Sequence, residues 1–194
     1  MPHTLIYIEA LDTKPRGAIT AIAAVTFDPE TQTLGKRFCK RVDPESSVSR
    51  GGTISAALFK WWLRQSPESR SQLLDASGSI SEALNELQCF IVRHSLYEPN
   101  GNTILWSRQS GDFCPISTLT AAFLNCNITP VWHHSDVRNT WSLEMMAHDT
   151  GMDFLATKFE GAAHDPLAHA TYQARLIMNA WNHITEPHKR DSQL

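Results

Sequence analysis

The 194-residue sequence lacks the long apolar runs and the cysteine pattern that mark membrane and disulfide-rich proteins. No apolar run approaches the roughly 20 residues of a membrane span, and the N-terminus has no signal-peptide pattern. The four cysteines are widely spaced and form no CxxC pair, which favours reduced thiols in a cytoplasmic protein. An excess of positive charge is also lacking, since the formal net charge is -3. Tight, non-specific binding of nucleic acid therefore has no electrostatic basis outside a local basic groove.

What the sequence does contain is typical of one globular α/β domain. Hydrophobic residues make up 42% of the chain and charged residues 19%, and the length suffices for a substantial core. We assign residues 1–185 to a single domain and the polar segment 186–194 to a flexible tail.

Hydrophobic periodicity and turn residues divide the domain into strands and helices. The expected strands cover residues 4–9, 18–27, 34–42, 103–107 and 129–133. The expected helices cover residues 55–65, 79–96, 113–126, 139–149 and 166–184, with a further helix beginning at Pro67. The segment 46–53 (SSVSRGGT) is expected to be a link rich in glycine and serine. Periodicity alone predicts a single α/β domain with a mixed sheet.

The two ends of the chain carry the most informative motifs. Residues 161–174 (GAAHDPLAHATYQA) resemble the last motif of the DEDDh class of 3′–5′ exonucleases, in which a general-base histidine precedes a metal-binding aspartate at the start of a long helix. His164 matches the base, but His169 stands where the aspartate is expected. Residues 5–13 (LIYIEALDT) resemble the opening Asp-x-Glu-Thr strand of the family, with Glu9 retained and Tyr7 in place of the aspartate.

The remaining motif of this family is altered as well. It normally reads Phe-Asp-x-Pro-Ile-Leu, whereas this chain has Phe113 at the metal-binding position and Asp112 one residue earlier. One residue at a helix start is a rotation of roughly 100°, which would aim the Asp112 carboxylate away from the site and leave it as the N-cap of the helix. A small local shift would instead let Asp112 reach a metal ion, and the sequence leaves both interpretations open.

Further segments resemble the phage exonuclease-A-type branch of the same family. These segments are residues 27–38 (FDPETQTLGKRF), 60–70 (KWWLRQSPESR) and 131–140 (VWHHSDVRNT). The resemblance covers about residues 4–182 of the chain. It implies an α/β ribonuclease-H-like fold, with a mixed five-stranded sheet flanked by helices.

The resemblance also implies which residues carry the chemistry. The family's reaction needs two divalent ions, held by carboxylates and by the substrate phosphate, so Glu9 is the expected catalytic and metal-binding carboxylate. Tyr7 is not an ordinary Mg²⁺ ligand, because the pKa of its phenol is near ~10. His164 is the expected general base, and His169 either binds a softer ion such as Zn²⁺ or Mn²⁺ or fills the place of the lost ligand. We expect Mg²⁺ or Mn²⁺ to bind weakly or not at all.

The leading hypothesis is a 3′–5′ exonuclease-like protein that binds a single-stranded nucleic-acid 3′ end weakly and whose catalysis is lost or strongly reduced. We predict nucleic-acid contacts at Thr13, Trp62 and Arg108, because an indole ring stacks on bases and a guanidinium contacts phosphates. Most of the six tryptophans are expected in the core. Two alternatives stay open: an active metal-dependent exonuclease with an altered site, and a non-enzymatic, phage-derived inhibitor or regulator that acts through a protein partner.

Overall fold

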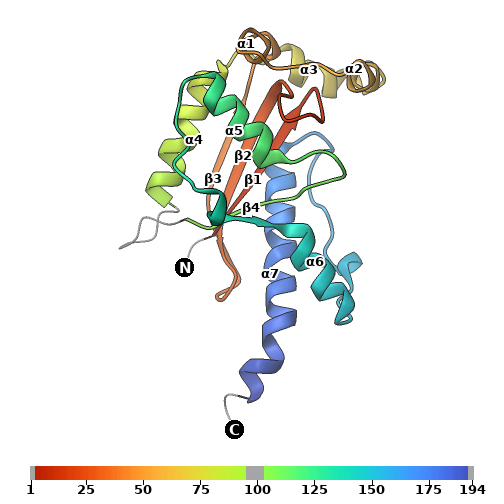
Figure 1. Cartoon of the computed structure of the whole chain (residues 1–194). Helices are drawn as coiled ribbons and strands as arrows, with labels where there is room; N and C mark the ends of the chain where they lie inside the picture. Colours follow the sequence, from red (N-terminus) through yellow and green to blue (C-terminus); the bar gives the residue numbers. More distant parts are fainter. Residues whose placement is uncertain (1–2, 95–102, 192–194) are drawn as a thin grey trace.

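A five-stranded mixed sheet forms the centre of the molecule (Figure 1). The computed structural model describes residues 3–94 and 103–191 of the chain. The strands are β1 (His3–Ala10), β2 (Ile19–Asp28), β3 (Thr33–Arg41), β4 (Leu105–Ser107) and β5 (Val137–Asn139), in the order β3-β2-β1-β4-β5. The first three strands are antiparallel, and β4 and β5 extend the sheet in parallel from β1. The sequence prediction of a mixed five-stranded sheet flanked by helices is confirmed.

Helices cover both faces of this sheet and one of its ends (Figure 1). One face carries α4 (Ile80–His94) and α5 (Pro115–Asn125), and the other carries α7 (Pro166–Asp191) with α6 (Thr140–Asp149) packed beside it. The short helices α1 (Pro44–Ser49), α2 (Ala56–Leu63) and α3 (Pro67–Leu74) lie at the end where β1 finishes. Across residues 3–94 and 103–191, no helix combines the length and the apolar character that crossing a bilayer requires.

The side chains of the central strand β1 alternate between the two helical layers. Ile6 and Ile8 belong to the core cluster that contains α4 and α5, whereas Leu5 belongs to the cluster that contains α7. Tyr7 packs at the edge of the α7 cluster. Because alternate residues of a strand share one face, Glu9 also lies on the α7 side, at the end of the strand.

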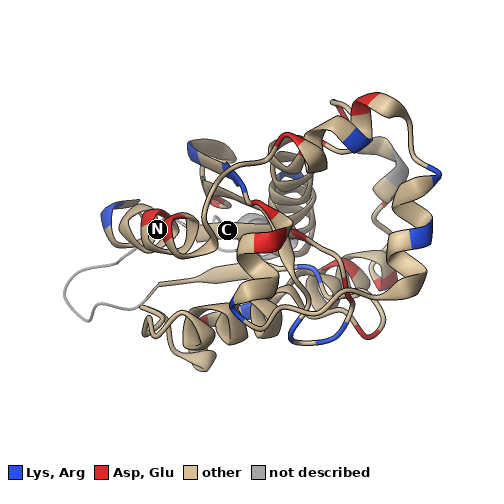
Figure 2. Ribbon diagram, turned by 90° about the horizontal axis from the view of Figure 1, so that it is seen from above, with Lys and Arg blue, Asp and Glu red and all other residues tan. Residues whose placement is uncertain are grey.

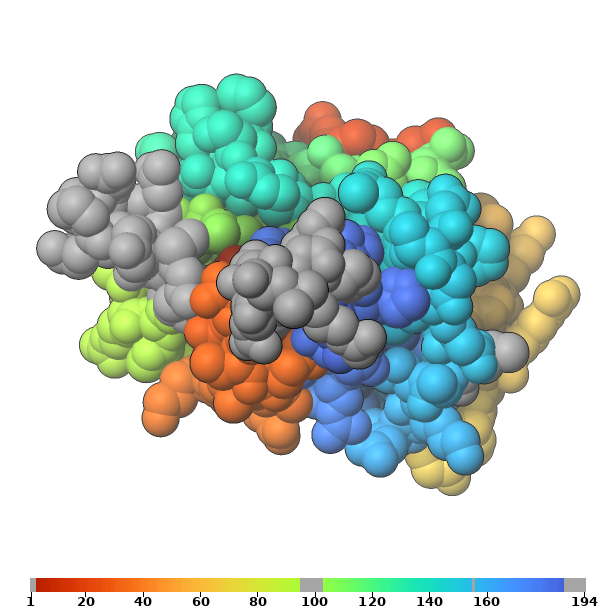
Figure 3. Space-filling model, turned by 90° about the horizontal axis from the view of Figure 1, so that it is seen from below, coloured from red at the N-terminus to blue at the C-terminus, as the bar shows by residue number. Residues whose placement is uncertain are grey.

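The long helix α7 lies between the β2–β3 hairpin and α6, as the view from below shows (Figure 3). Gln32 adopts the left-handed conformation at the tip of the hairpin, with a φ of 56°. Its Nε2 donates hydrogen bonds to the backbone oxygen of Met178 in α7 at 2.9 Å and to that of Pro29 at 2.6 Å. One side chain thus connects the hairpin turn to the helix.

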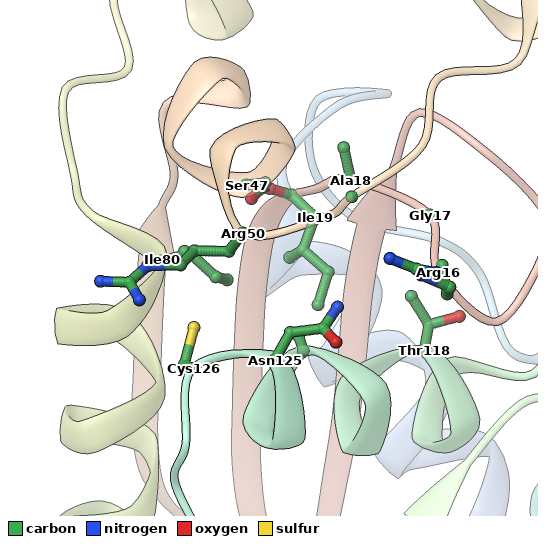
Figure 4. Close-up of a pocket in the computed structure, with 12 residues that line it drawn as sticks. Arg16, Gly17, Ala18, Ile19, Ser47, Arg50, Ile80, Thr118, Asn125 and Cys126 are labelled. Atoms are coloured by element: carbon green, nitrogen blue, oxygen red, sulfur yellow. Dashed lines mark hydrogen bonds between the residues drawn. The ribbon is translucent and has the colours of Figure 1, made fainter.

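At the opposite end of the sheet, α1 packs on the start of β2 (Figure 4). The hydroxyl of Ser47 donates to the backbone oxygen of Ile19 at 2.6 Å. Arg16, Asn125 and Cys126 surround the small gap that remains, which has a volume of about 10 Å³. A cavity of this size is near the minimum for one water molecule, so this corner is a packing contact and not a ligand site.

The prediction of a strand at residues 129–133 is wrong. The fifth strand is β5, which pairs with β4, and residues 129–133 form a loop. Pro130 has no backbone N–H to donate to a sheet, and Trp132 is buried edge-on against Phe123 of α5 with ring centroids 5.0 Å apart. The apolar character of this segment therefore reflects packing on α5 and not strand pairing.

Two further boundaries differ from expectation. The first residues of the segment 46–53, predicted as a link, belong to the helix α1. This helix forms because Asp43 caps it by accepting the N–H of Glu45 at 3.0 Å and Pro44 occupies its first turn. At the other end of the chain, α7 continues to Asp191, past the predicted boundary at residue 185. The flexibility of the tail stays a prediction, and residues 95–96 and 192–194 lie outside the described part of the chain.

A buried histidine sits at the start of β1. His3 is 5% exposed, and its Nδ1 accepts a hydrogen bond from Trp106 Nε1 at 3.0 Å. The rings of Phe27 and Trp181 meet the imidazole edge-on at 5.5 and 5.7 Å. Burial lowers the pKa of His3 to about 4, so the ring is neutral at neutral pH.

We expect protonation of His3 to destabilise the fold as the pH falls. The pKa is about 4 in the folded chain against an ordinary 6.5, so the stabilisation is complete above pH 6.5 and is lost as the pH falls through 4. The loss reaches about 3 kcal/mol in the free energy of unfolding, measurable by urea unfolding at stepped pH. His3→Gln retains an acceptor for Trp106 but should lose this pH dependence, whereas exposed His148→Gln should retain it. An unchanged profile in His3→Gln would contradict a buried neutral His3.

Candidate active site

A cleft of about 630 Å³ opens where β1 ends, and it collects residues that are far apart in the sequence. Its walls come from β1 and the following loop, from α2, from the turn at residues 110–113 and from the segment that leads into α7. The predicted site residues that line it are Tyr7, Glu9, Thr13, Trp62, Phe113, His164 and His169. The first and last sequence motifs therefore meet in one cleft.

Glu9 sits on the floor of this cleft in an unfavourable environment for a charge. Burial raises its pKa to about 7, Arg41 lowers it in part, and Asp165 adds to the increase. Arg41 lies in the same row of the sheet, since Glu9 pairs with Ala21 and Ala21 pairs with Arg41. Sequence analysis missed Arg41 because only the strand register reveals this row. At neutral pH, Glu9 is divided between its neutral and ionised forms.

An aromatic stack occupies the space beside Glu9. The rings of Tyr7 and His169 lie 9° from parallel with centroids 5.1 Å apart, and Phe159 packs 4.6 Å from the imidazole. His169 Nε2 donates a hydrogen bond to the backbone oxygen of Ala163 at 2.7 Å, so this nitrogen carries a proton. Burial, and then Glu9, raises the pKa of the Tyr7 phenol further above its ordinary value. His169 is therefore held by ring contacts and by one backbone hydrogen bond, and its role as a metal ligand stays a prediction.

His164 faces the cleft from the segment before α7. Its Nε2 lies 3.3 Å from Gln65 Oε1, and the rings of Trp61 and Trp62 contact the imidazole with centroids 5.6 and 5.1 Å away. Burial lowers the pKa of His164 below its ordinary value, so the neutral ring is favoured. His164 therefore presents a neutral hydrogen-bonding group inside an aromatic wall.

Backbone contacts fix the segment that carries His164. Asp165 caps α7, since its Oδ1 accepts the N–H of Ala168 at 3.2 Å. Arg41 donates to the backbone oxygen of His164 at 3.1 Å. Gly161 has a φ of 142°, and a Cβ there would collide with the side chain of Ala168. A glycine is required for the loop to approach the helix this closely.

Phe113 and Asp112 occupy different environments. The backbone groups of Ser110 and Phe113 exchange two hydrogen bonds of 3.0 Å, which closes a tight turn. Phe113 lines the cleft, whereas Asp112 is exposed at the turn and is not among the lining residues. The N-cap of α5 is Cys114, so the interpretation of Asp112 as the helix cap is wrong. Its role as a metal ligand stays a prediction.

The three predicted nucleic-acid contacts are placed differently. Thr13 is exposed at the cleft, and Trp62 lines it while only 8% exposed. Arg108 lies outside the cleft in a neighbouring pocket, where its guanidinium pairs with Glu144. Of the six tryptophans, Trp62, Trp106 and Trp132 are buried and Trp181 packs partly buried against the core, whereas Trp61 and Trp141 are exposed.

Two residues of the cleft, Trp61 in α2 and Gln65 just after this helix, are not among the contacts that the sequence predicts. Trp61 is 44% exposed and lines the cleft together with Gln65. Both follow Leu58, another lining residue, at spacings of three and seven positions, which place side chains on one face of a helix. This spacing was a signal that could have identified them.

The side chains around Glu9 do not fit a two-metal centre. Among the described residues, no group of three or more His, Cys, Asp and Glu side chains is arranged to hold a metal ion. Phe113 has no donor atom, and the Tyr7 phenol keeps its proton. The other carboxylate of the lining, Asp12, accepts a hydrogen bond from the hydroxyl of Thr53 at 2.7 Å. The described lining therefore supplies Glu9 and Asp12 as its carboxylates, fewer than a pair of Mg²⁺ ions calls for.

The charged side chains of this cleft do not favour tight binding of a phosphate group. Lys, Arg, Asp and Glu are interspersed over the ribbon of the described chain (Figure 2). The residues that line the cleft include Glu9 and Asp12 but neither lysine nor arginine. Aromatic contacts and hydrogen bonds are thus the interactions that this cleft can offer a ligand.

Comparisons with known proteins agree with this fold. A sequence-family profile described as "3'-5' exoribonuclease Rv2179c-like domain" matches residues 2–181. Comparison with curated proteins gives no match.

Several solved nucleases share the architecture. The nuclease domain of 3'hExo, a DEDDh family member bound to rAMP, has a TM-score of 0.54 and 16% identity, covering 91% of this chain and 90% of that chain. E. coli exonuclease I in complex with a dA16 oligonucleotide has a TM-score of 0.62 and 12% identity, covering 98% and 42%. Cell-death related nuclease 4 has a TM-score of 0.61 and 13% identity, covering 92% and 64%. At these identities the likeness concerns the ribonuclease-H-like fold.

We expect Glu9 to make the fold less stable as the pH rises. Its pKa is about 7 in the folded chain against an ordinary 4.5, so its contribution to stability is complete below pH 4.5 and is lost as the pH rises through 7. The free energy of unfolding should fall by on the order of 2 kcal/mol between pH 5 and pH 8, after allowance for solvent at the cleft opening. Denaturant titrations at both pH values would measure this fall.

Glu9→Gln should abolish the fall and should be more stable than the native chain at pH 8, because the amide carries no charge to bury. Glu86→Gln is the matched control, since Glu86 is half exposed and lies outside the cleft. If Glu9→Gln kept the native pH dependence, the burial of Glu9 would be refuted.

Proposed function

Because the chain belongs to the 3'-5' exoribonuclease Rv2179c-like domain family, we propose that its cleft binds the 3′ end of a single-stranded nucleic acid with catalysis lost or strongly reduced. The observation that carries this proposal is the Tyr7–His169 stack, which occupies the space beside Glu9 where the resemblance implies metal-binding carboxylates. Losing even an outer-shell partner of a metal site typically costs about 10–100-fold in affinity or activity. Replacing directly coordinating residues should cost more.

The remaining residues support binding through aromatic contacts. Trp61 offers a half-exposed ring, and base stacking on such a ring contributes about 1–3 kcal/mol per base. His164 and Gln65 lie beside it and supply hydrogen-bonding groups for a ribose hydroxyl or a base edge. Thr13 adds a hydroxyl at the cleft.

The charge of the cleft also favours binding without metal ions. Of the positions that hold carboxylates in the family, only Glu9 keeps one inside this cleft, and burial brings its pKa to about 7. A cleft with fewer negative charges repels a phosphate backbone less, so fewer bound cations are needed to hold the backbone there.

The finer parts of the proposal rest on the sequence. Segments 60–70 and 131–140 support kinship with phage exonuclease-A-type nucleases, and the cytoplasmic location stays a prediction. RNA is the first ligand to test, because the family description is that of an exoribonuclease.

Two other functions have an observation in their favour. Glu9 and His164 share one cleft, which would suit an active exonuclease with an altered site. An apolar groove of about 530 Å³ along α2 and α3, which includes exposed Phe59 and Leu63, would suit a protein partner of a non-enzymatic regulator.

We expect no efficient release of nucleotides from 3′-labelled single-stranded RNA or DNA in Mg²⁺ or Mn²⁺, because the residues beside Glu9 lack the donor set for two ions. Gel analysis of labelled strands would measure release, with Glu9→Ala as the control for contaminating nuclease. Turnover in the native chain that disappears in Glu9→Ala would contradict the proposal. The triple variant Tyr7→Asp, Phe113→Asp and His169→Asp should recover part of the activity if the three positions alone account for the loss.

We also expect weak, salt-sensitive binding of single strands that persists in EDTA. Fluorescence anisotropy with labelled oligonucleotides at low and moderate salt would measure the dissociation constant. Trp61→Ala should weaken binding by about 5-fold or more through loss of stacking, whereas Leu74→Ala, at an exposed position outside the cleft, should not. If the native chain shows no binding at tens of micromolar protein, the nucleic-acid function fails and a protein partner is favoured.

A further inference from the structure

A second pocket of about 420 Å³ lies beside the cleft, on the turn at residues 110–113. Its lining residues are Arg108, Gln109, Ser110, Gly111, Asn139 and Trp141. Ser110 also lines the cleft, so the two cavities meet at this residue. A ligand that leaves the cleft over Ser110 therefore reaches the second pocket directly.

Trp141 gives this pocket an exposed aromatic surface. Its side chain is 47% exposed although it is one of the largest apolar groups in the chain. The backbone N–H of Trp141 donates to Asn139 Oδ1 at 3.1 Å, which fixes the backbone of this residue at the start of α6. The guanidinium carbon of Arg108 lies 5.2 Å from the centre of the indole ring and supports it by a cation–π contact. The ring is thus positioned and yet open to a ligand.

The guanidinium of Arg108 is paired with a buried carboxylate. Its Nη2 and Nε donate to Glu144 Oε2 at 2.9 and 3.3 Å, and its Nε also donates to Oε1 at 3.2 Å. The Glu144 side chain is 6% exposed, so movement of Arg108 would leave a buried carboxylate without its partner. The pair contributes no net charge, and the pocket therefore suits a neutral, planar ligand better than an anion.

We propose that this pocket binds a nucleobase of the strand whose 3′ end lies in the cleft, with the base stacked on Trp141. The inference rests on the proposed function. It places this base second on the 5′ side of the terminal nucleotide, which is the third position from the 3′ end and out of reach of a dinucleotide, because a strand held by its 3′ end continues only in the 5′ direction. The amide and hydroxyl groups of Gln109, Ser110 and Asn139 line the same pocket and supply partners for the edge of the base. Arg108 then acts as the support of Trp141, not as the phosphate contact that the sequence predicts.

The test compares the native chain with Trp141→Ala for single-stranded RNA of increasing length, by fluorescence anisotropy in EDTA. Dinucleotide affinity should stay unchanged, whereas longer strands should bind about 5-fold or more weakly in the variant, through loss of one stacked base. An abasic nucleotide scanned along the longer strand should identify one internal position that weakens the native chain but not Trp141→Ala. Such non-additivity is the signature of a direct contact.

Trp141→Phe retains an aromatic face and should keep most of the affinity, and thermal unfolding would verify that each variant is folded. If the native chain binds no strand of any length, the proposed function itself fails. If the native chain binds and Trp141→Ala binds every strand equally well, the second base site is refuted while the proposed function stands. Equal losses for dinucleotides and for longer strands would also refute it, because Trp141 would then act on the cleft.

Discussion

The pleat of the central strand β1 is the constraint on which the rest of the molecule depends. Its side chains have to serve two hydrophobic layers at once, so Ile6 and Ile8 face α4 and α5 while Leu5 and Tyr7 face α7. A register slip of one residue would exchange the two sets and move Glu9 out of the cleft. The irregular pairing after Glu9 marks the point at which the chain leaves the sheet and begins to form the wall of the cleft.

Much of this arrangement could be predicted from the sequence, for physical reasons. β1 and α7 carry strong periodic patterns, and Asp165 before Pro166 is a capping signal that needs no tertiary information. β5 could not be located, because a three-residue strand has no periodicity and Trp132 nearby owes its burial to α5. The orientation of Asp112 was equally inaccessible, since it depends on a turn closed by backbone hydrogen bonds.

In each of the two cavities the charge of one side chain is reduced or compensated, although different residues are involved. In the cleft, burial suppresses the charge of Glu9, and in the second pocket Glu144 compensates the charge of Arg108. The exposed rings of Trp61 and Trp141 are therefore the main contact surfaces that the two cavities offer to a ligand. Recognition through rings tolerates any base, because every base has an aromatic face.

The Tyr7–His169 stack has a consequence for the substitutions that this chain tolerates. The two rings support each other across a gap between β1 and α7, so a single change at either position removes a packing partner from the other. A change of one ring to aspartate would also bring a second carboxylate close to buried Glu9 before any cation site existed to compensate it. A single change to aspartate at position 7 or 169 is therefore unfavourable for both packing and charge. The stack couples the two positions, so a carboxylate at either one is disfavoured while the other keeps its ring.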